Sequence, residues 1–332
     1  MSRPLRVVQL GLGPIGRACV RGAMERGGLR VVGAVDPEPS LAGRDLGRVS
    51  GLRRDLRVPV DPVPDRVLRR PPDLALHTTV SSLVDALPQI APFLEAGVNV
   101  VSSTEEMCYP WRSRPGVARR LDRMARSGGA SVHGTGVNPG FAMDVLALVL
   151  SRAALEVRGL RLIRVQDAAT RRLQLRLKVG AGISRAAFRR RAREGSIGHV
   201  GLRESMDLIA AGLGWELESY EHRLSPVVAP RDLPGPPPVK RGGVAGQREV
   251  LWGFRDGREA IRMELVIALG AGEPRDEVQL RGRPNLTLRI EGGTPGDVAT
   301  AAALLNVAPH VAAASPGLRT ALDLPLPRRA AS

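Results

Sequence analysis

Two adjacent carboxylates, Glu105 and Glu106, have the clearest capacity for acid–base chemistry in this sequence. They follow an apolar segment, residues 97–101, that has the composition of a buried strand. In an open α/β sheet, ligands collect at the carboxyl ends of the strands. A glutamate beside a poorly hydrated ligand has a raised pKa and can exchange protons near neutral pH. Since neighbouring side chains diverge, one carboxylate should face the ligand, and the other should be a cap, an ion-pair partner or solvated.

A glycine pattern near the start of the chain predicts what that ligand is. Gly11, Gly13 and Gly16 follow an apolar segment and open a helical pattern, and Asp36 lies twenty residues beyond Gly16. A glycine turn between a strand and a helix, with an acidic residue about twenty positions further on, is the context that dinucleotide binding requires. The first glycine permits a tight turn, the second lets the backbone approach the pyrophosphate at a helix N-terminus, and the third lets helix and strand pack closely. A hydride carrier beside a carboxylate predicts redox chemistry with a proton partner.

The sequence leaves the choice between NAD and NADP open and favours NAD slightly. Asp36 can accept hydrogen bonds from the adenosine ribose and would repel a 2′-phosphate, whereas Arg44 lies close enough in sequence to offset that charge. His77 is interpreted either as a neighbour of the nicotinamide ribose or as a buried structural histidine. The other cofactor candidates lie in the glycine turn and after later strands: Pro14, Ile15, Thr78, Thr79 and Asn138.

Short apolar segments alternate with helical patterns over the first domain, residues 1–145, which predicts an α/β, doubly wound parallel sheet of the Rossmann type. The expected strands are residues 5–10, 29–35, 73–77, 98–101 and 130–133, and the expected helices are residues 14–24, 83–96 and 116–127.

A second domain, residues 146–294, has the pattern of an α+β fold with a mostly antiparallel sheet. Residues 295–332 should form a closing helix, over 295–307, and pack back on the first domain. The expected β segments are residues 160–165, 173–179, 247–253, 261–269, 278–280 and 286–290; the expected helices are 185–193 and 206–212, and residues 225–243, rich in proline and glycine, should be an exposed loop.

Substrate recognition is assigned mainly to the second domain. Arg171, Arg172 and Lys178 can clamp a carboxylate, although a merely basic sheet face explains the same residues equally well. The other candidates for the substrate pocket are Tyr109, Phe141, Asp167 and His199.

Composition excludes several classes of protein. The chain has 332 residues, 43% of them hydrophobic, and no apolar run long enough to span a membrane. Its net charge of +16 comes almost entirely from arginine, while aromatic residues make up only 3%, which argues against nucleic-acid binding through stacked bases. Two cysteines, Cys19 and Cys108, form no metal-ligand spacing. We therefore expect a cytoplasmic protein without a metal, a nucleic-acid partner or a membrane anchor.

Several strings, in order along almost the whole chain, resemble the 2,4-diaminopentanoate dehydrogenase family, which includes native NAD(P)H-dependent amine dehydrogenases and is related to dihydrodipicolinate reductases. The matching strings are VVQLGLGPIG at 7–16, ALHTTVSS at 75–82, NVVSSTEEMCYPW at 99–111, GTGVNPGFAMD at 134–144, KVGAG at 178–182, GSIGHVGLRES at 195–205 and ASPGLRTALDLPLPR at 314–328. One position departs: Arg176 stands where the resemblance leads us to expect a glutamine.

The resemblance implies a homodimer that interconverts an amine with a ketone and ammonia, using a nicotinamide dinucleotide. A glutamate of the family's matching segment handles the ammonia, which carries over to Glu105, with Glu106 as the less favoured register. Two alternatives remain. One is an imine reductase, like dihydrodipicolinate reductase, that acts on another substrate, although no pair of adjacent histidines occurs here. The other is a catalytically silent NAD(P)-binding sensor.

Overall fold

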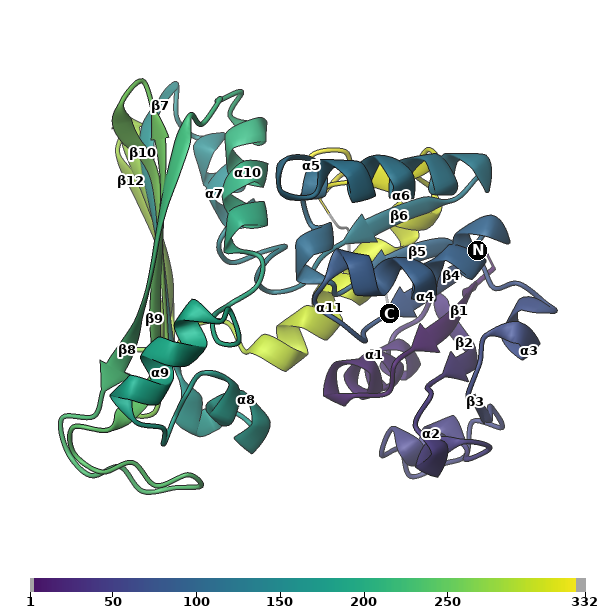
Figure 1. Cartoon of the computed structure of the whole chain (residues 1–332). Coiled ribbons are helices and arrows are strands. Elements are labelled where there is room, and N and C mark those ends of the chain that lie inside the picture. Colours follow the sequence, from purple (N-terminus) through teal and green to yellow (C-terminus); the bar gives the residue numbers. More distant parts are fainter. Residues whose placement is uncertain (1–2, 327–332) are drawn as a thin grey trace. The chain divides into compact units, whose positions relative to one another are not determined.

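The structure, a computed structural model, describes residues 3–326 (Figure 1). Its contacts divide the chain into two units, one made of residues up to Phe141 together with those from Pro295 onward, and the other spanning Ala142–Thr294. The outermost residues of the expected domains, 1–2 and 327–332, lie outside the described residues. Within the described residues, no helix is both long and apolar enough to cross a membrane.

The first unit is built on a seven-stranded sheet in the order β13-β6-β5-β4-β1-β2-β3, and every neighbouring pair is parallel. The predicted doubly wound parallel sheet is confirmed. Its strands are β1 (Leu5–Leu10), β2 (Leu29–Val35), β3 (Val60–Asp61), β4 (Leu74–His77), β5 (Asn99–Ser102), β6 (Ser131–Gly134) and β13 (Gly317–Arg319). The sequence patterns did not indicate the edge strands β3 and β13, because each is only two or three residues long.

Helices cover the sheet of this unit. They are α1 (Pro14–Glu25), α2 (Leu46–Val49), α3 (Asp65–Leu68), α4 (Leu83–Glu95), α5 (Pro110–Ser113), α6 (Pro115–Ser127) and α11 (Gly296–Ala312), with short 3₁₀ turns at η1 (Pro39–Leu41) and η2 (Glu105–Met107). The C-terminal helix α11 packs with α1 in one core cluster, in which Cys19 and Ala23 meet Leu304 and Leu305.

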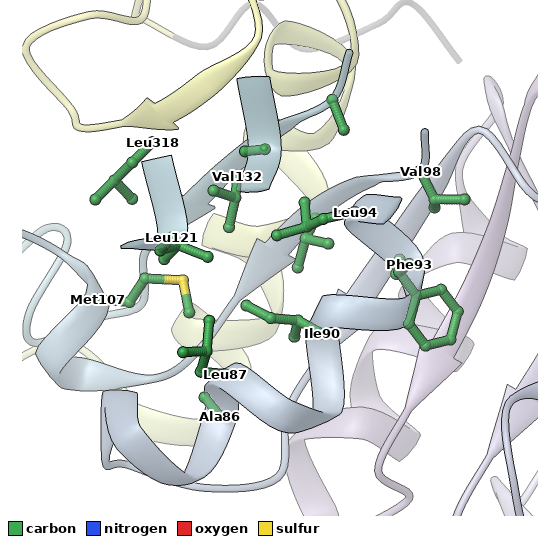
Figure 2. Packing of buried hydrophobic residues seen from close by; sticks show 14 of the residues in the cluster. Ala86, Leu87, Ile90, Phe93, Leu94, Val98, Met107, Leu121, Val132 and Leu318 are labelled. Atoms are coloured by element: carbon green, nitrogen blue, oxygen red, sulfur yellow. The ribbon is translucent and has the colours of Figure 1, made fainter. Parts of the chain in front are cut away.

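A second core cluster lies between the sheet and α4 and α6 (Figure 2). Leu83, Leu87, Ile90 and Leu94 recur at helical spacing along α4, and all four are buried. Each fully buried leucine of this kind stabilises the fold by about 2 kcal/mol relative to an exposed one. This packing fixes the start of α4 next to the ends of β4 and β5, where the predicted site lies.

The second unit contains a six-stranded sheet in the order β12-β11-β7-β10-β9-β8. All its pairs are antiparallel except β10 with β7, so the predicted mostly antiparallel sheet is confirmed. The elements are β7 (Glu156–Asp167), β8 (Ser219–Val228), β9 (Val244–Arg255), β10 (Arg258–Ala268), β11 (Arg275–Arg283) and β12 (Leu286–Glu291), with α7 (Val145–Ser151), η3 (Ala168–Thr170), α8 (Leu173–Lys178), α9 (Arg185–Arg193) and α10 (Leu202–Gly212).

Two expectations for this unit are wrong. Residues 173–179, expected as a β segment, form the helix α8 through Lys178. The leucines of this segment alternate as in a strand. However, residues 173–178 are all leucine, glutamine, arginine or lysine, and each of these residue types favours a helix. The expected loop over 225–243 begins as strand, because β8 continues to Val228. Pro226 is tolerated there because β8 is an edge strand, where the lost N–H donor has no partner to satisfy.

Candidate dinucleotide and proton-transfer site

The glycine turn between β1 and α1 has the geometry that the sequence predicts. Gly11 has a φ of +82°, which favours glycine, and a Cβ there would lie 2.7 Å from Thr79 Cγ2. A Cβ on Gly16 would lie 2.0 Å from the carbonyl oxygen of Gly11, so helix and turn can approach only with glycine. A Cβ on Gly13 would meet no atom within 4 Å, so its backbone is open to a ligand. The cradle therefore fits a pyrophosphate at the N-terminus of α1.

A pocket of about 640 Å³ opens beside this turn. Its walls come from the ends of β1 and β2, from the segment after β4, and from one side of α4. The lining residues are Leu10, Gly11, Gly13, Val35, Asp36, Pro37, Pro62, Pro64, Thr78, Thr79, Val80, Pro88, Gln89, Pro92 and Phe93. Gly11, Gly13, Asp36, Thr78 and Thr79 were predicted as cofactor residues, so the structure brings five of those candidates together. Pro14 and Ile15 begin α1 and do not line this pocket.

Asp36 directly follows β2 and lines the pocket, and its carboxylate is oriented by the backbone. One oxygen accepts a hydrogen bond from the N–H of Leu12 at 2.6 Å, and the other accepts from the N–H of Glu38 at 2.9 Å. Each oxygen keeps a further lone pair for a ligand hydroxyl. Arg44, which the sequence suggested as a counter-charge, is exposed and does not line the pocket.

His77 is the last residue of β4 and Thr78 follows it, but the two side chains have different surroundings. The hydroxyl of Thr78 lies 3.1 Å from the Gly11 carbonyl oxygen, to which it donates, and accepts from Gln9 Nε2 at 2.8 Å, so Thr78 braces the glycine turn. His77 is fully buried behind the pocket wall and does not line the pocket. Burial lowers its pKa from 6.5 to about 4, which makes the ring neutral at physiological pH.

The two glutamates both lie in η2, shortly after the end of β5. Glu106 accepts a hydrogen bond from the N–H of Leu83, the first residue of α4, at 2.8 Å, and it pairs with the Arg114 guanidinium at 2.9 Å. It therefore caps the positive N-terminus of α4. Glu105 is the first residue of η2, is half-buried, and follows the buried Thr104. Glu106 thus has the cap and ion-pair role that the sequence assigned to one of the two.

Three further candidates surround this edge of the sheet. Tyr109 is half-buried and precedes α5. Asn138 is buried in the turn after β6, and the neighbouring N–H of Val137 donates to Thr300 Oγ1 on α11 at 3.3 Å. Phe141 is the last residue of the first unit before the chain enters the second, and its side chain is exposed.

In the second unit, the predicted substrate residues fall into separate groups. Asp167 accepts hydrogen bonds from the backbone N–H groups of Ala169 and Gly270 at 2.9 and 3.0 Å, so it shapes a turn. Arg171 and Arg172 lie between η3 and α8 and line none of the principal pockets. Arg176 donates to the carbonyl oxygens of Arg171, Ala169 and Pro236, so it binds together the segments around α8.

His199 and Lys178 line a separate pocket of about 560 Å³. Its deepest group is Glu249 on β9, which accepts from the N–H of His199 at 2.8 Å and lies 2.8 Å from His222 Nε2. The hydrogen bond to Glu249 raises the pKa of His222 above its ordinary value. Neither Glu249 nor His222 was predicted from the sequence, although Glu249 lies within the expected β segment 247–253. The two side chains face the same side of paired strands.

No group of three or more His, Cys, Asp or Glu side chains among residues 3–326 is arranged to hold a metal ion. The parallel sheet, the glycine turn and the pocket beside it are those of a Rossmann-type oxidoreductase. Comparisons with known proteins narrow this class.

The chain belongs to the 2,4-diaminopentanoate dehydrogenase family, as its motifs predicted. The sequence profile described as the 2,4-diaminopentanoate dehydrogenase C-terminal domain matches residues 141–332. A 2,4-diaminopentanoate dehydrogenase from Acetoanaerobium sticklandii is 32% identical over 98% of this chain and 94% of its own length. An amine dehydrogenase from Streptomyces virginiae is 25% identical, over 97% of this chain and 96% of its own.

Solved structures agree with this assignment. An amine dehydrogenase from Mycobacterium smegmatis superposes with a TM-score of 0.87 at 28% identity, covering 98% of this chain and 97% of that one. A dihydrodipicolinate reductase from a Paenisporosarcina species reaches a TM-score of 0.54 at 15% identity, covering 97% of this chain and 99% of that one, and so shares the fold.

Proposed function

We propose that this protein is an NAD(P)-dependent amine dehydrogenase that oxidises an amine to a ketone and ammonia, and catalyses the reverse reaction. The observation that carries the proposal is the pair of adjacent glutamates after β5, at the carboxyl edge of the sheet that also carries the glycine turn. Glu106 caps α4 and pairs with Arg114, while Glu105 begins the turn next to it. Membership of the family supports the same chemistry, since the relatives are named amine and 2,4-diaminopentanoate dehydrogenases.

A nicotinamide dinucleotide held at Gly11, Gly13 and Asp36 would supply a hydride acceptor, so that oxidation of the amine-bearing carbon would give an iminium group on the substrate. The residues of the chain handle the protons. Glu105 removes a proton from the substrate ammonium before oxidation and releases it to solvent. It then takes a proton from the water that adds to the iminium carbon and passes that proton to the nitrogen of the carbinolamine, whose hydroxyl proton is lost to solvent. Collapse of the resulting carbinolamine breaks the C–N bond and releases ammonia. A positioned carboxylate contributes roughly 100-fold or more to such steps.

Asp36 favours NAD over NADP in this proposal. Backbone N–H groups hold its carboxylate in the pocket, where two oxygens can accept from the ribose hydroxyls. A 2′-phosphate in the same place meets a fixed negative charge. The counter-charge proposed for Arg44 has no support from the pocket lining.

We further infer that the enzyme is a cytoplasmic homodimer that pairs through the face of the six-stranded sheet opposite α7 and α10. That face carries Arg161 and Arg248 on either side of Glu264, at 3.6 and 2.8 Å, and the indole of Trp252 lies between Arg223 and Arg262. Alternating charges and an exposed-face aromatic residue with flanking arginines suit an isologous contact. Light scattering should give twice the chain mass for the wild type, and Trp252→Glu should give a monomer. A wild-type monomer at micromolar concentration would refute the dimer.

The function is tested by following nicotinamide absorbance with a panel of ketones and keto acids, with and without ammonium. The proposal predicts oxidation of the reduced cofactor only when ammonium is present. Oxidation without ammonium would instead indicate a carbonyl or imine reductase. Cofactor binding without turnover on any member of the panel would favour the silent sensor.

A further inference from the structure

A chain of hydrogen bonds connects the ends of β4 and β5 inside the first unit, and the proposed function gives it no task. His77 and Ser102 are paired in the register of these strands, and His77 Nδ1 lies 2.8 Å from Ser102 Oγ. The Ser102 hydroxyl donates to Thr104 Oγ1 at 2.9 Å, and the Thr104 hydroxyl donates to the carbonyl oxygen of Val80 at 2.9 Å. The side chains of His77, Ser102 and Thr104 are completely buried.

The direction of each hydrogen bond follows from the Val80 end. Thr104 gives its only hydroxyl hydrogen to a carbonyl oxygen, so it accepts from Ser102. Ser102 then has no hydrogen left and accepts from His77, which places the ring hydrogen on Nδ1. Because burial lowers the pKa of His77 to about 4, the ring is neutral and its Nε2 atom is an acceptor. With this tautomer, the contact of Nε2 with Gln89 Oε1 at 3.2 Å joins two acceptors and is not a hydrogen bond.

The other end of the chain reaches the dinucleotide pocket. His77 Nε2 lies 2.7 Å from Thr79 Oγ1, and Thr79 Oγ1 lies 2.6 Å from Gln89 Oε1. Both Thr79 and Gln89 line the pocket. The Thr79 hydroxyl has only one hydrogen, and both His77 Nε2 and Gln89 Oε1 can accept it. A ligand hydroxyl that donates to Gln89 therefore allows Thr79 to donate to His77, which links occupancy of the pocket to the buried chain.

The buried chain also holds the backbone that leads to Glu105. The N–H of Thr104 donates to Ser102 Oγ at 3.0 Å, and the N–H of Ser103 donates to the carbonyl oxygen of His77 at 2.9 Å. One residue later, Glu105 begins η2, which is closed by the N–H of Met107 bonding to the carbonyl oxygen of Thr104 at 3.0 Å. A short loop is mobile unless such bonds fix it, and misplacement by about 1 Å can cost roughly 100-fold in rate.

We propose that His77, Ser102 and Thr104 are positioning residues whose hydrogen-bond chain fixes the turn carrying Glu105 to the wall of the dinucleotide pocket. This inference rests on the proposed function, because it gives the chain a task in placing a proton-transferring carboxylate. Thr104 is the most informative position, since valine has nearly the shape of threonine without the hydroxyl, and serine keeps the hydroxyl without the methyl group.

The test compares Thr104→Val, Thr104→Ser and a matched control, Ser131→Ala. Like Thr104, Ser131 is fully buried, and it lies on β6. Its hydroxyl bonds to Asn99 Oδ1 at 3.0 Å and to the Val311 carbonyl oxygen. Thr104→Val should lower kcat at least about tenfold and leave the Kd for NADH within about twofold. Thr104→Ser should recover most of the turnover. Ser131→Ala should lower thermal stability without a comparable loss of kcat.

A second readout is independent of turnover. Hydrogen exchange of the amides over residues 103–107 should slow when NADH binds the wild type. In Thr104→Val, NADH binding should no longer slow the exchange of these amides. The positioning role is overturned if NADH protects this segment equally in both proteins, or if Thr104→Ser is as impaired as Thr104→Val. A wild type that binds NADH and shows the protection but oxidises no amine would refute the proposed function while leaving the link between pocket and turn in place.

Discussion

Two regions of the molecule combine histidine and glutamate in opposite ways. At the carboxyl edge of the seven-stranded sheet, His77 is surrounded by hydroxyl and amide groups, and burial lowers its pKa to about 4. In the pocket on the six-stranded sheet, His222 is half-exposed and bonds directly to the buried carboxylate of Glu249, which raises its pKa. The first histidine is therefore held neutral and the second is stabilised as a cation.

The difference shows that the partner, as well as burial, decides what a histidine can do. Neutral partners let His77 fix the β4 and β5 ends without adding charge, so proton transfer at that edge is left to Glu105. When His222 is protonated, its carboxylate partner Glu249 makes the pair a salt bridge at the edge of the second sheet. Replacing individual residues in each region tests this contrast.

The largest expected effect comes from Glu105→Gln. Removing the carboxylate should lower kcat for amine oxidation roughly 100-fold or more, about 2.7 kcal/mol, while cofactor affinity stays near normal. Glu106→Gln is the matched control, because it changes the adjacent carboxylate, which caps α4. It should mainly reduce thermal stability. Equal losses of kcat in the two variants would remove the distinction between them.

Acidification should weaken the first region through His77. Its folded-state pKa lies below the ordinary value of 6.5, so the unfolded chain takes up the proton first as the pH falls. The stability that neutral His77 contributes is fully present above 6.5, and about 2 kcal/mol is lost between pH 6.5 and about 5. Denaturant unfolding of the wild type and His77→Asn should show a shallower pH dependence in the variant. The buried His133, whose pKa is also lowered, is present in both proteins, and identical slopes would contradict the prediction.

Asp36→Asn tests the charge at the same sheet edge. The amide keeps one oxygen, which can accept from one of the two backbone N–H groups of Leu12 and Glu38, and it removes the negative charge. The ratio of the Kd for NADPH to the Kd for NADH should fall by about tenfold, which corresponds to about 1.4 kcal/mol. Fluorescence titration with each cofactor measures this ratio, and an unchanged ratio would show that Asp36 does not select the cofactor.

The smallest effect concerns the second region. Glu249→Gln should lower the pKa of His222 toward its ordinary value and cost about 1 kcal/mol of stability, since a hydrogen bond to a charged group is lost and a neutral one takes its place. Because the raised pKa stabilises the fold at low pH, this contribution should disappear as the pH rises through the folded-state pKa of His222. Proton NMR of the ring follows that titration. An unshifted His222 in the variant would show that Glu249 does not set its charge.

Much of the first unit is predictable from sequence because its signals are local. The glycine spacing at Gly11, Gly13 and Gly16 and the apolar strands identify the sheet, the turn and the pocket. The role of Glu106 required the structure, since its bond to the N–H of Leu83 joins two segments that are 23 residues apart in sequence. The pair of Glu249 and His222 was missed for the same reason, because only strand pairing brings them together.

The central claim, oxidation at an amine-bearing carbon, is tested most directly with deuterium. The oxidised cofactor is incubated with 2,4-diaminopentanoate or a simple amine that carries deuterium at its amine-bearing carbons, and the reduced cofactor is examined by mass spectrometry. The proposal predicts reduced cofactor one mass unit heavier than the undeuterated product, formed together with an equal amount of ammonia. Reduced cofactor without deuterium, or formed without ammonia, would contradict it.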